Sequence, residues 1–481
     1  MATEGSWGEL FSGRSALQAI ALSGGVGLHA VNVYVATTIL PSVVRDIGGL
    51  DYYAWNTTLF VVASIVGSAL SARPLQTFGP RGAFGLALLL FTAGSLVCGA
   101  APSMQVMLVG RTLQGFGGGL VFALSYVIIR LIYSEALWPR AMALVSGMWG
   151  ISTLFGPAVG GIFAEMDAWR AAFWTVAGIA VLLLLLAFAV LPKRTTDEDR
   201  QAPIAFAQLV LLAGAVLAIS IGSVSKAINH NITGIAVALV LIILLCVIEG
   251  RASTRLFPHR ALNVFSPLGA AYAALALLVF SVPGSEIFVP YFLQILHGLS
   301  PLAAGYLAAV MAASWTAAQI GGAGLKGGGA RKAILLAGPI MIVGFLGMAW
   351  PIQSDVEVKL LAALVVALLL IGFGVGLAWP HLLTRVLHVA PEDEQNLAAS
   401  AITTIQLFAT ALGAAVAGMI ANLAGLTNPG GVEGAANAAH WLFLLFAIAP
   451  LLAFPVALSI TNGMRAAGRS AGAEDVGIAG H

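Results

Sequence analysis

Charge is scarce in this sequence. Asp, Glu, Lys and Arg make up only 9% of its 481 residues, whereas 59% are hydrophobic. Soluble domains carry about a quarter charged residues, so an ordinary soluble domain is excluded and a polytopic membrane protein is indicated. The net charge of +2 says little about partners. No basic patch of the kind that binds nucleic acids is present, and we expect no nucleic-acid partner.

Cysteines and catalytic motifs are also sparse. Cys98 and Cys246 fall in apolar runs that we place at opposite membrane depths, which argues against a disulfide, and no metal-ligand spacing occurs. Gly327-Gly328-Gly329 lacks the Gly-Lys-Ser/Thr ending of a phosphate-binding loop, and there is no nucleophile elbow. We therefore expect no enzyme, no metal and no bound cofactor. The N-terminus lacks the basic start of a signal peptide, so the first apolar run should remain as a transmembrane helix.

Long apolar runs are abundant. About fourteen are long enough to cross a bilayer of roughly 30 Å, in the order six, two and six. They predict an all-α polytopic membrane protein with two six-helix bundles and two inserted transmembrane helices. The runs lie at about Ala16–Leu40, Trp55–Leu75, Gly82–Ala100, Met107–Tyr133, Ala141–Ala164, Ala171–Leu191, Phe206–Val224, Ile232–Ile248, Pro267–Ile295, Leu302–Leu325, Ala333–Trp350, Leu360–Leu383, Leu397–Leu423 and Ala439–Ile460.

An internal repeat relates the two bundles. Gly115–Leu120 matches Gly372–Leu377 at an offset of 257, and Phe155–Gly161 matches Leu412–Gly418 at the same offset. Two matches at one offset indicate a parallel pseudo-repeat. The predicted domains are an N-terminal six-helix bundle at 1–192, a linker with two extra transmembrane helices at 193–265, a C-terminal six-helix bundle at 266–464 and a cytoplasmic tail at 465–481.

The positions of Lys and Arg predict the orientation. With the N-terminus inside, seventeen of the 22 basic residues lie on the cytoplasmic side, four lie outside and Arg111 lies within a helix. Losing one span would reverse every later loop and destroy this asymmetry, so the number of spans should be even. We expect a multi-pass protein of the cell (inner) membrane with both termini in the cytoplasm.

One glycine-rich run, Gly147–Gly161, combines features of close helix packing. Gly156 and Gly160 are four residues apart and clear one helix face, Gly161 follows, and Pro157 removes a backbone donor and bends the helix. A packing helix with an incidental kink is the simpler interpretation. The run resembles the antiporter motif in the fifth helix of major facilitator superfamily exporters. The resemblance implies that this face seals against the opposite bundle.

Further motifs carry the resemblance along the chain. Gly79-Pro80-Arg81 resembles the superfamily's cytoplasmic loop signature, although Gln76 stands where an acid is usual. Arg111-Thr112-Leu113-Gln114-Gly115 resembles the fourth-helix motif of drug:proton exporters. Tyr291-Phe292-Leu293-Gln294 resembles the ninth-to-tenth helix junction of their fourteen-spanner branch. Asn32 replaces the Asp that the first helix of that branch usually carries, so one familiar coupling site is missing.

The resemblance implies a secondary active transporter that exports small amphipathic compounds or drugs by proton-coupled alternating access. Its partners would be a small-molecule substrate, protons and the lipid bilayer, its energy source the proton gradient, and we expect a monomer. Proton-coupled uptake or metabolite export on the same fold is the alternative. A membrane-embedded enzyme or lipid-handling protein would need a polar catalytic constellation, and none is found.

Three residues are candidates for proton coupling. Glu286 is the only acid that we place inside a spanning run, and Arg111 is the only embedded base. A charge at the bilayer centre costs roughly 2.5–3.5 kcal/mol, so both should face an interior cavity. We predict that Glu286 carries the proton and that Arg111 sets its affinity. His29, three residues before Asn32 on the same helix face, is a possible relay. The simpler alternatives are a snorkelling acid, a structural arginine and a buried neutral histidine.

The predicted substrate cavity combines polar and aromatic side chains. Aromatic rings suit apolar or cationic compounds, although most such residues simply pack or lie in interfacial belts. The candidates are Asn32, Gln114, Trp149, Tyr291, Gln294, Trp315 and Trp379.

Overall fold

The computed structural model describes residues 6–193, 205–225, 227–349 and 358–478, and these residues form helices and short turns. Parts of the predicted linker, the end of the eleventh run at Trp350 and the last residues of the predicted tail lie outside the described residues. The helices are α1 (Trp7–Leu10), α2 (Gly13–Ile47), η1 (Leu50–Tyr52), α3 (Trp55–Leu70), α4 (Ala72–Gly99), α5 (Met104–Ile132), η2 (Glu135–Leu137), α6 (Trp138–Glu165), α7 (Trp169–Val190), α8 (Phe206–Val224), α9 (Ile228–Arg251), α10 (Pro267–Phe280), α11 (Val282–His297), α12 (Pro301–Gly322), α13 (Gly328–Ala349), α14 (Val358–Val389), η4 (Glu392–Glu394), α15 (Gln395–Leu423), α16 (Gly431–Phe446) and α17 (Ile448–Ile478).

Fourteen segments of the described chain are long and apolar enough to cross a membrane, which confirms the predicted all-α, fourteen-span class. Two of the spans are pairs of α-helices. The ninth, Pro267–His297, breaks at Ser281 between α10 and α11, and the last, Gly431–Met464, joins α16 to α17. At the start of the third span the chain turns at Gly79, whose φ of 66° suits glycine.

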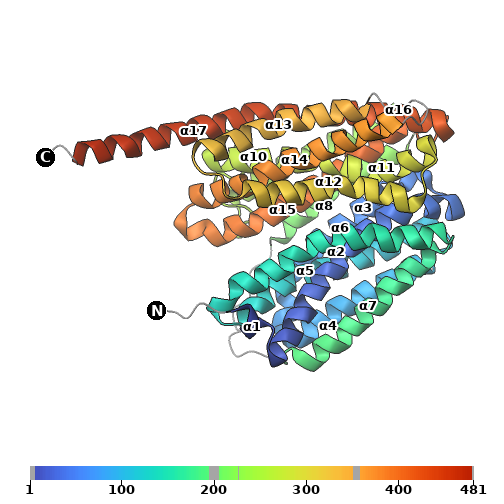
Figure 1. Cartoon of the computed structure of the whole chain (residues 1–481), viewed down its shortest axis with the longest axis horizontal. Helices are drawn as coiled ribbons and strands as arrows, with labels where there is room; N and C mark the ends of the chain where they lie inside the picture. The colour runs from blue at the N-terminus through green and yellow to red at the C-terminus, as the bar shows by residue number, and fades with distance from the viewer. Residues whose placement is uncertain (1–5, 194–204, 226, 350–357, 479–481) are drawn as a thin grey trace.

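The spans form two bundles (Figure 1). Helices α2 to α7 lie in one bundle and α10 to α17 in the other. The bundles diverge toward the end where both termini lie and come together at the opposite end. We call that meeting region the interbundle junction. There the Tyr53 ring lies 5.3 Å from the rings of both Phe288 and Tyr291, and Asn422 donates to the Asp51 carbonyl at 3.0 Å.

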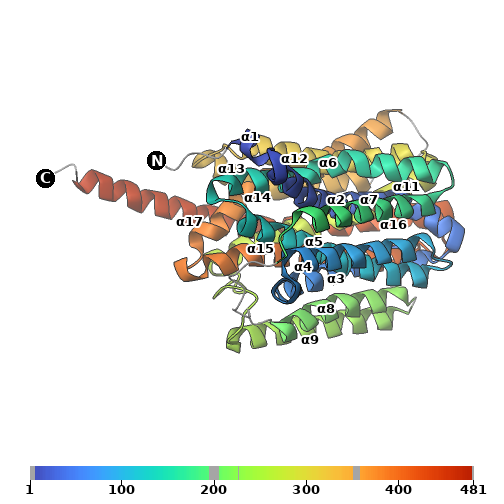
Figure 2. The ribbon, with the colours of Figure 1, turned by 90° about the horizontal axis from the view of Figure 1, so that it is seen from below.

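The two inserted helices, α8 and α9, lie together along one side of the molecule, with α9 outermost (Figure 2). We call this pair the insert. Helix α8 packs against α15 of the C-terminal bundle and α3 of the N-terminal bundle. All of these elements share one apolar cluster, made of Phe60, Val61, Val62, Ala215, Val216, Ile219, Ala238, Ala411, Ala415 and Met419. The insert therefore covers the seam between α3 and α15.

The internal repeat appears as repeated helix packing. In the N-terminal bundle α5 packs between α3 and α4, and in the C-terminal bundle α14 packs between α12 and α13. Gly119 of α5 faces the backbone of Ser64, and Gly376 of α14 faces the backbone of Trp315 in the same way. Because no side chain separates these backbones, the paired helices approach closely. The repeated glycines thus mark equivalent places in the two bundles.

Candidate functional site

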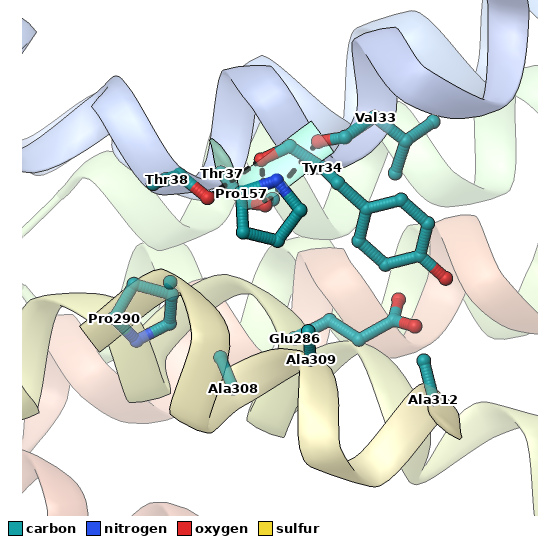
Figure 3. A pocket seen from close by; sticks show the side chains of 11 residues that line it. Val33, Tyr34, Thr37, Thr38, Pro157, Glu286, Pro290, Ala308, Ala309 and Ala312 are labelled. Carbon is teal, nitrogen blue, oxygen red and sulfur yellow. Dashed lines mark hydrogen bonds between the residues drawn. The ribbon is translucent and has the colours of Figure 1, made fainter. Parts of the chain in front are cut away.

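A small pocket lies where the two bundles meet, between α2, α6, α11 and α12 (Figure 3). Its volume is about 10 Å³, on the order of what one water molecule needs. Most of its walls are apolar or small. The lining residues are Val33, Tyr34, Thr37, Thr38, Pro157, Glu286, Pro290, Gly305, Ala308, Ala309 and Ala312.

Glu286 contributes the acid of this pocket. It lies in the first turns of α11, just after the break at Ser281, and its carboxylate points toward the hydroxyl end of Tyr34 (Figure 3). Among the described residues it has neither a hydrogen bond nor an ion pair. An ionised carboxylate is poorly solvated in such surroundings, whereas the protonated form is readily accommodated. The arrangement can therefore couple proton binding to the closing of the bundles around the pocket.

Arg111 lies in a different cluster, inside the N-terminal bundle. Its side chain is 1% exposed. It donates to the Asn56 carbonyl at 3.2 Å and to the Gln114 amide oxygen, and its guanidinium lies 4.2 Å from the Phe60 ring centroid. Within the described part of the chain no hydrogen bond or ion pair joins it to Glu286. Direct pairing of the two is therefore absent in this conformation, and control of Glu286 by Arg111 stays a prediction.

Asn32, Gln114 and His29 belong to the same buried region as Arg111. The Gln114 amide donates to Asn32 Oδ1 at 3.0 Å and to the Ser95 hydroxyl at 2.8 Å. His29 stacks on Phe60 with ring centroids 5.1 Å apart, and its Nδ1 has no hydrogen-bond partner. Asn32 and Gln114 are 0% exposed, so both face a packed interior in this conformation.

The predicted aromatic cavity residues fall into separate groups. Trp149 lies edge-on to His29 at 6.2 Å, Trp315 and Trp379 contact each other at 5.4 Å, and Tyr291 belongs to the interbundle junction. Gln294, on α11 with Tyr291, is half-buried, and its Nε2 has no hydrogen-bond partner. None of these predicted cavity residues lines the Glu286 pocket.

Gly156, Gly160 and Gly161 of the antiporter-like run are buried, but their partners correct one expectation. A Cβ on Gly160 would lie 3.0 Å from the Val35 carbonyl, and one on Gly156 would meet Tyr34. Both partners belong to α2 of the same bundle. Gly161 faces the opposite bundle, against Leu302 of α12, and Gly150 lies near Thr316 of the same helix. The expectation that Gly156 faces the opposite bundle was wrong, because α6 turns that face toward α2.

The loop motif at Gly79 holds two helices together. The Arg81 side chain donates to the Leu191 carbonyl at 2.9 Å, and its backbone N–H donates to the Pro192 carbonyl at 3.1 Å. These bonds connect the start of the third span to the end of α7.

Sequence reasoning missed Tyr34, Thr37 and Thr38 as pocket residues. Their spacing of three and four places them on one face of α2, which was an available signal. Nothing in the sequence indicated that this face meets Glu286, some 250 residues later.

Two bundles of membrane-spanning helices with an acid at their interface define a helical membrane transporter. The sequence profile of the Major Facilitator Superfamily matches residues 22–414. The chain belongs to this superfamily.

Relatives and solved structures agree with this assignment. A probable multidrug-efflux transporter of Mycobacterium tuberculosis is 36% identical over 459 residues, covering 93% of this chain and 96% of the relative. The multidrug efflux pump SdrM of Staphylococcus aureus is 23% identical over 365 residues, covering 75% and 80%. A bacterial homologue of the human lysosomal transporter Spinster, in an inward-facing and unoccupied conformation, superposes with a TM-score of 0.64 at 15% identity, covering 94% and 97% of the two chains.

Proposed function

We propose that this protein exports small amphipathic compounds in exchange for protons. The observation that carries the proposal is Glu286, an acid without a polar partner in the described structure, enclosed at the interface of two bundles. The names of the Mycobacterium and Staphylococcus relatives support efflux as the direction. The proton gradient supplies the energy, and no bound cofactor is needed.

The mechanism follows from the cost of burying charge. When the bundles close around the pocket, an ionised Glu286 loses solvation and a protonated Glu286 does not. Movement of the bundles between the outward-open and the inward-open state is therefore favoured when Glu286 carries a proton. The pocket is far smaller than the roughly 300–1,000 Å³ that drug-sized ligands occupy, so Glu286 serves the proton. The substrate therefore binds elsewhere between the bundles; of the predicted cavity residues, Tyr291 lies at the interbundle junction.

The cellular setting completes the proposal. The distribution of basic residues assigns both termini to the cytoplasm and the interbundle junction to the outer side of the cell membrane. The pocket is lined by α2, α6, α11 and α12 of a single chain. One copy of the chain therefore supplies both bundles of the transport path, and a monomer suffices.

The test is Glu286→Gln in proteoliposomes with an imposed pH difference, using ethidium as the first probe. Glutamine keeps size and polarity but carries no exchangeable proton. We expect gradient-driven accumulation to fall at least tenfold, while downhill exchange of the dye continues. Glu135→Gln, an exposed acid in η2, is the matched control and should transport normally. Accumulation that survives Glu286→Gln would place coupling elsewhere, with His29 as the next candidate. Dye movement in the opposite direction would favour uptake.

A further inference from the structure

Tyr53 brings a buried hydroxyl into the interbundle junction. It directly follows η1 in the second span and is 1% exposed. Its ring lies 5.3 Å from the rings of both Phe288 and Tyr291, which belong to α11 of the opposite bundle. The tyrosine therefore packs across the interface at the end where the two bundles come together (Figure 1).

The ring and the hydroxyl of Tyr53 contribute to this contact with opposite signs. Tilted and edge-on aromatic pairs at such distances are favourable, so the ring stabilises the closed junction. The hydroxyl oxygen is buried and has no hydrogen-bond partner among the described residues. Buried polar groups normally have such a partner, because losing water without a replacement is unfavourable. The hydroxyl therefore destabilises the same closed arrangement.

The face of α11 that meets Tyr53 has a similar character. Ser285 lies one turn before Phe288, and Gln294 lies one turn after Tyr291. The Ser285 hydroxyl and the Gln294 Nε2 are also buried without partners in the described structure. Such atoms would only weaken an interface that stays closed. In an interface that must separate during every transport cycle, they limit how firmly it closes.

Other contacts at the junction act in the closing direction. Asn422 donates to the Asp51 carbonyl at 3.0 Å. Ala54, the residue after Tyr53, packs against Gly418 of α15, where a Cβ would lie 2.6 Å from the Ala54 Cβ. Closure is thus favoured by a hydrogen bond and by close packing, and the tyrosine hydroxyl opposes both.

We propose that the Tyr53 hydroxyl is a conformational device that keeps the interbundle junction able to open. When the bundles separate there, water reaches the hydroxyl and supplies the hydrogen bonds that the closed junction does not. The hydroxyl thereby shifts the population toward the open junction, while the ring contacts shift it toward the closed one. This role concerns the movement of the bundles and does not depend on Glu286.

The test measures how often the junction opens, with neither substrate nor a pH difference present. The reporter is Ala54→Cys in a background without Cys98 and Cys246, because Ala54 is 4% exposed and contacts the opposite bundle. Purified protein in detergent is labelled with maleimide, dilute enough for the rate to rise linearly with its concentration, so that the rate is proportional to the open fraction. Dividing by the rate of the same variant unfolded in sodium dodecyl sulfate corrects for the reactivity of the thiol itself. We expect Tyr53→Phe to slow labelling roughly fivefold or more.

Tyr52→Phe is the matched control. Tyr52 precedes Tyr53, is half-buried and contacts the Trp55 ring at 5.9 Å, and loss of its hydroxyl should leave the labelling rate unchanged. An equal or faster rate in Tyr53→Phe overturns the inference, and so does an equal slowing in Tyr52→Phe.

Thermal unfolding gives a second and independent measurement. Phenylalanine keeps the ring contacts of Tyr53 and removes a buried hydroxyl without a partner, so Tyr53→Phe should unfold at the same temperature as the unsubstituted protein or a higher one. A lower unfolding temperature would mean that the hydroxyl stabilises the closed structure, which also overturns the inference. The proposed function fails in a different measurement, when Glu286→Gln still accumulates dye against its gradient.

Discussion

Arg111 is a buried cation that is held by uncharged groups. Its neighbours are the Asn56 carbonyl, the Gln114 amide oxygen and the Phe60 ring. Asn32 accepts a hydrogen bond from Gln114, so the amide oxygen of Gln114 remains free to face Arg111. With asparagine at position 32, the cluster around Arg111 keeps its hydrogen bonds but contains no acid. This leaves Glu286 as the acid that lines the pocket between α2, α6, α11 and α12.

Replacing Arg111 with lysine should destabilise the N-terminal bundle. An ammonium cannot reproduce the planar fork that reaches both Asn56 and Gln114, and buried acceptors left without donors cost about 1–3 kcal/mol. We expect a lower unfolding temperature in detergent. Arg130→Lys is the matched control on α5, because Arg130 is exposed and its recorded contact is the Trp138 ring at 5.8 Å. Equal unfolding temperatures for the two variants would contradict a structural role for this cluster.

At the residue scale, the sequence indicated Glu286 and Arg111 as embedded charges but not which groups they meet, and it missed Glu249, which is buried in α9. Glu286 and Arg111 stand out because charge is so scarce in apolar runs. Their separation into two clusters depends on the rotation of α5 and α11 about their axes, which hydropathy does not report. Tyr34 escaped notice for the same reason.

At the scale of helices, the repeated glycines have the same role in both bundles. Gly119 and Gly376 each let a central helix lie directly on the backbone of its neighbour. The Ser64 and Ser68 hydroxyls donate across the N-terminal contact to the carbonyls of Gly115 and Gly119, both at 3.0 Å. The sequence offset of 257 predicted these equivalent positions, because close backbone contact restricts residue choice strongly enough to leave a pattern.

Alanine at Gly119 or Gly376 should therefore be destabilising. The added methyl group would press on the backbone of Ser64 or Trp315, and overpacking of this kind costs about 1–3 kcal/mol. Gly178→Ala provides the control, since nothing lies within 4 Å of a Cβ there and alanine is the better helix former. Thermal unfolding should rank Gly178→Ala at or above the unsubstituted protein and the other two below it. A loss at Gly178 as large as the other two would contradict overpacking as the cause, because a methyl group there meets no neighbouring atom.

At the scale of the whole molecule, the number and order of spans followed from the sequence because bilayer thickness fixes helix length. The position of the insert did not. Its helices are apolar on most faces, and hydropathy cannot say which seam they cover. The structure places α8 against both α3 and α15, so the insert contacts both bundles, which must move relative to each other during transport.

Asn422 joins these three parts at the interbundle junction. Its amide donates at 3.0 Å to the Asp51 carbonyl of the N-terminal bundle and at 3.0 Å to the Ser223 carbonyl at the end of α8. Asn422→Ala removes both bonds, and we expect the junction to open more often.

A cysteine at Ala54, which is 4% exposed and lies against Gly418 of α15, would report this opening. In a background without Cys98 and Cys246 it should react with maleimide several-fold faster when Asn422 is alanine. Asn229→Ala, an exposed residue of the insert, should leave the rate unchanged. If the two variants react equally fast, Asn422 does not hold the junction closed, and apolar packing around α8 alone must do so.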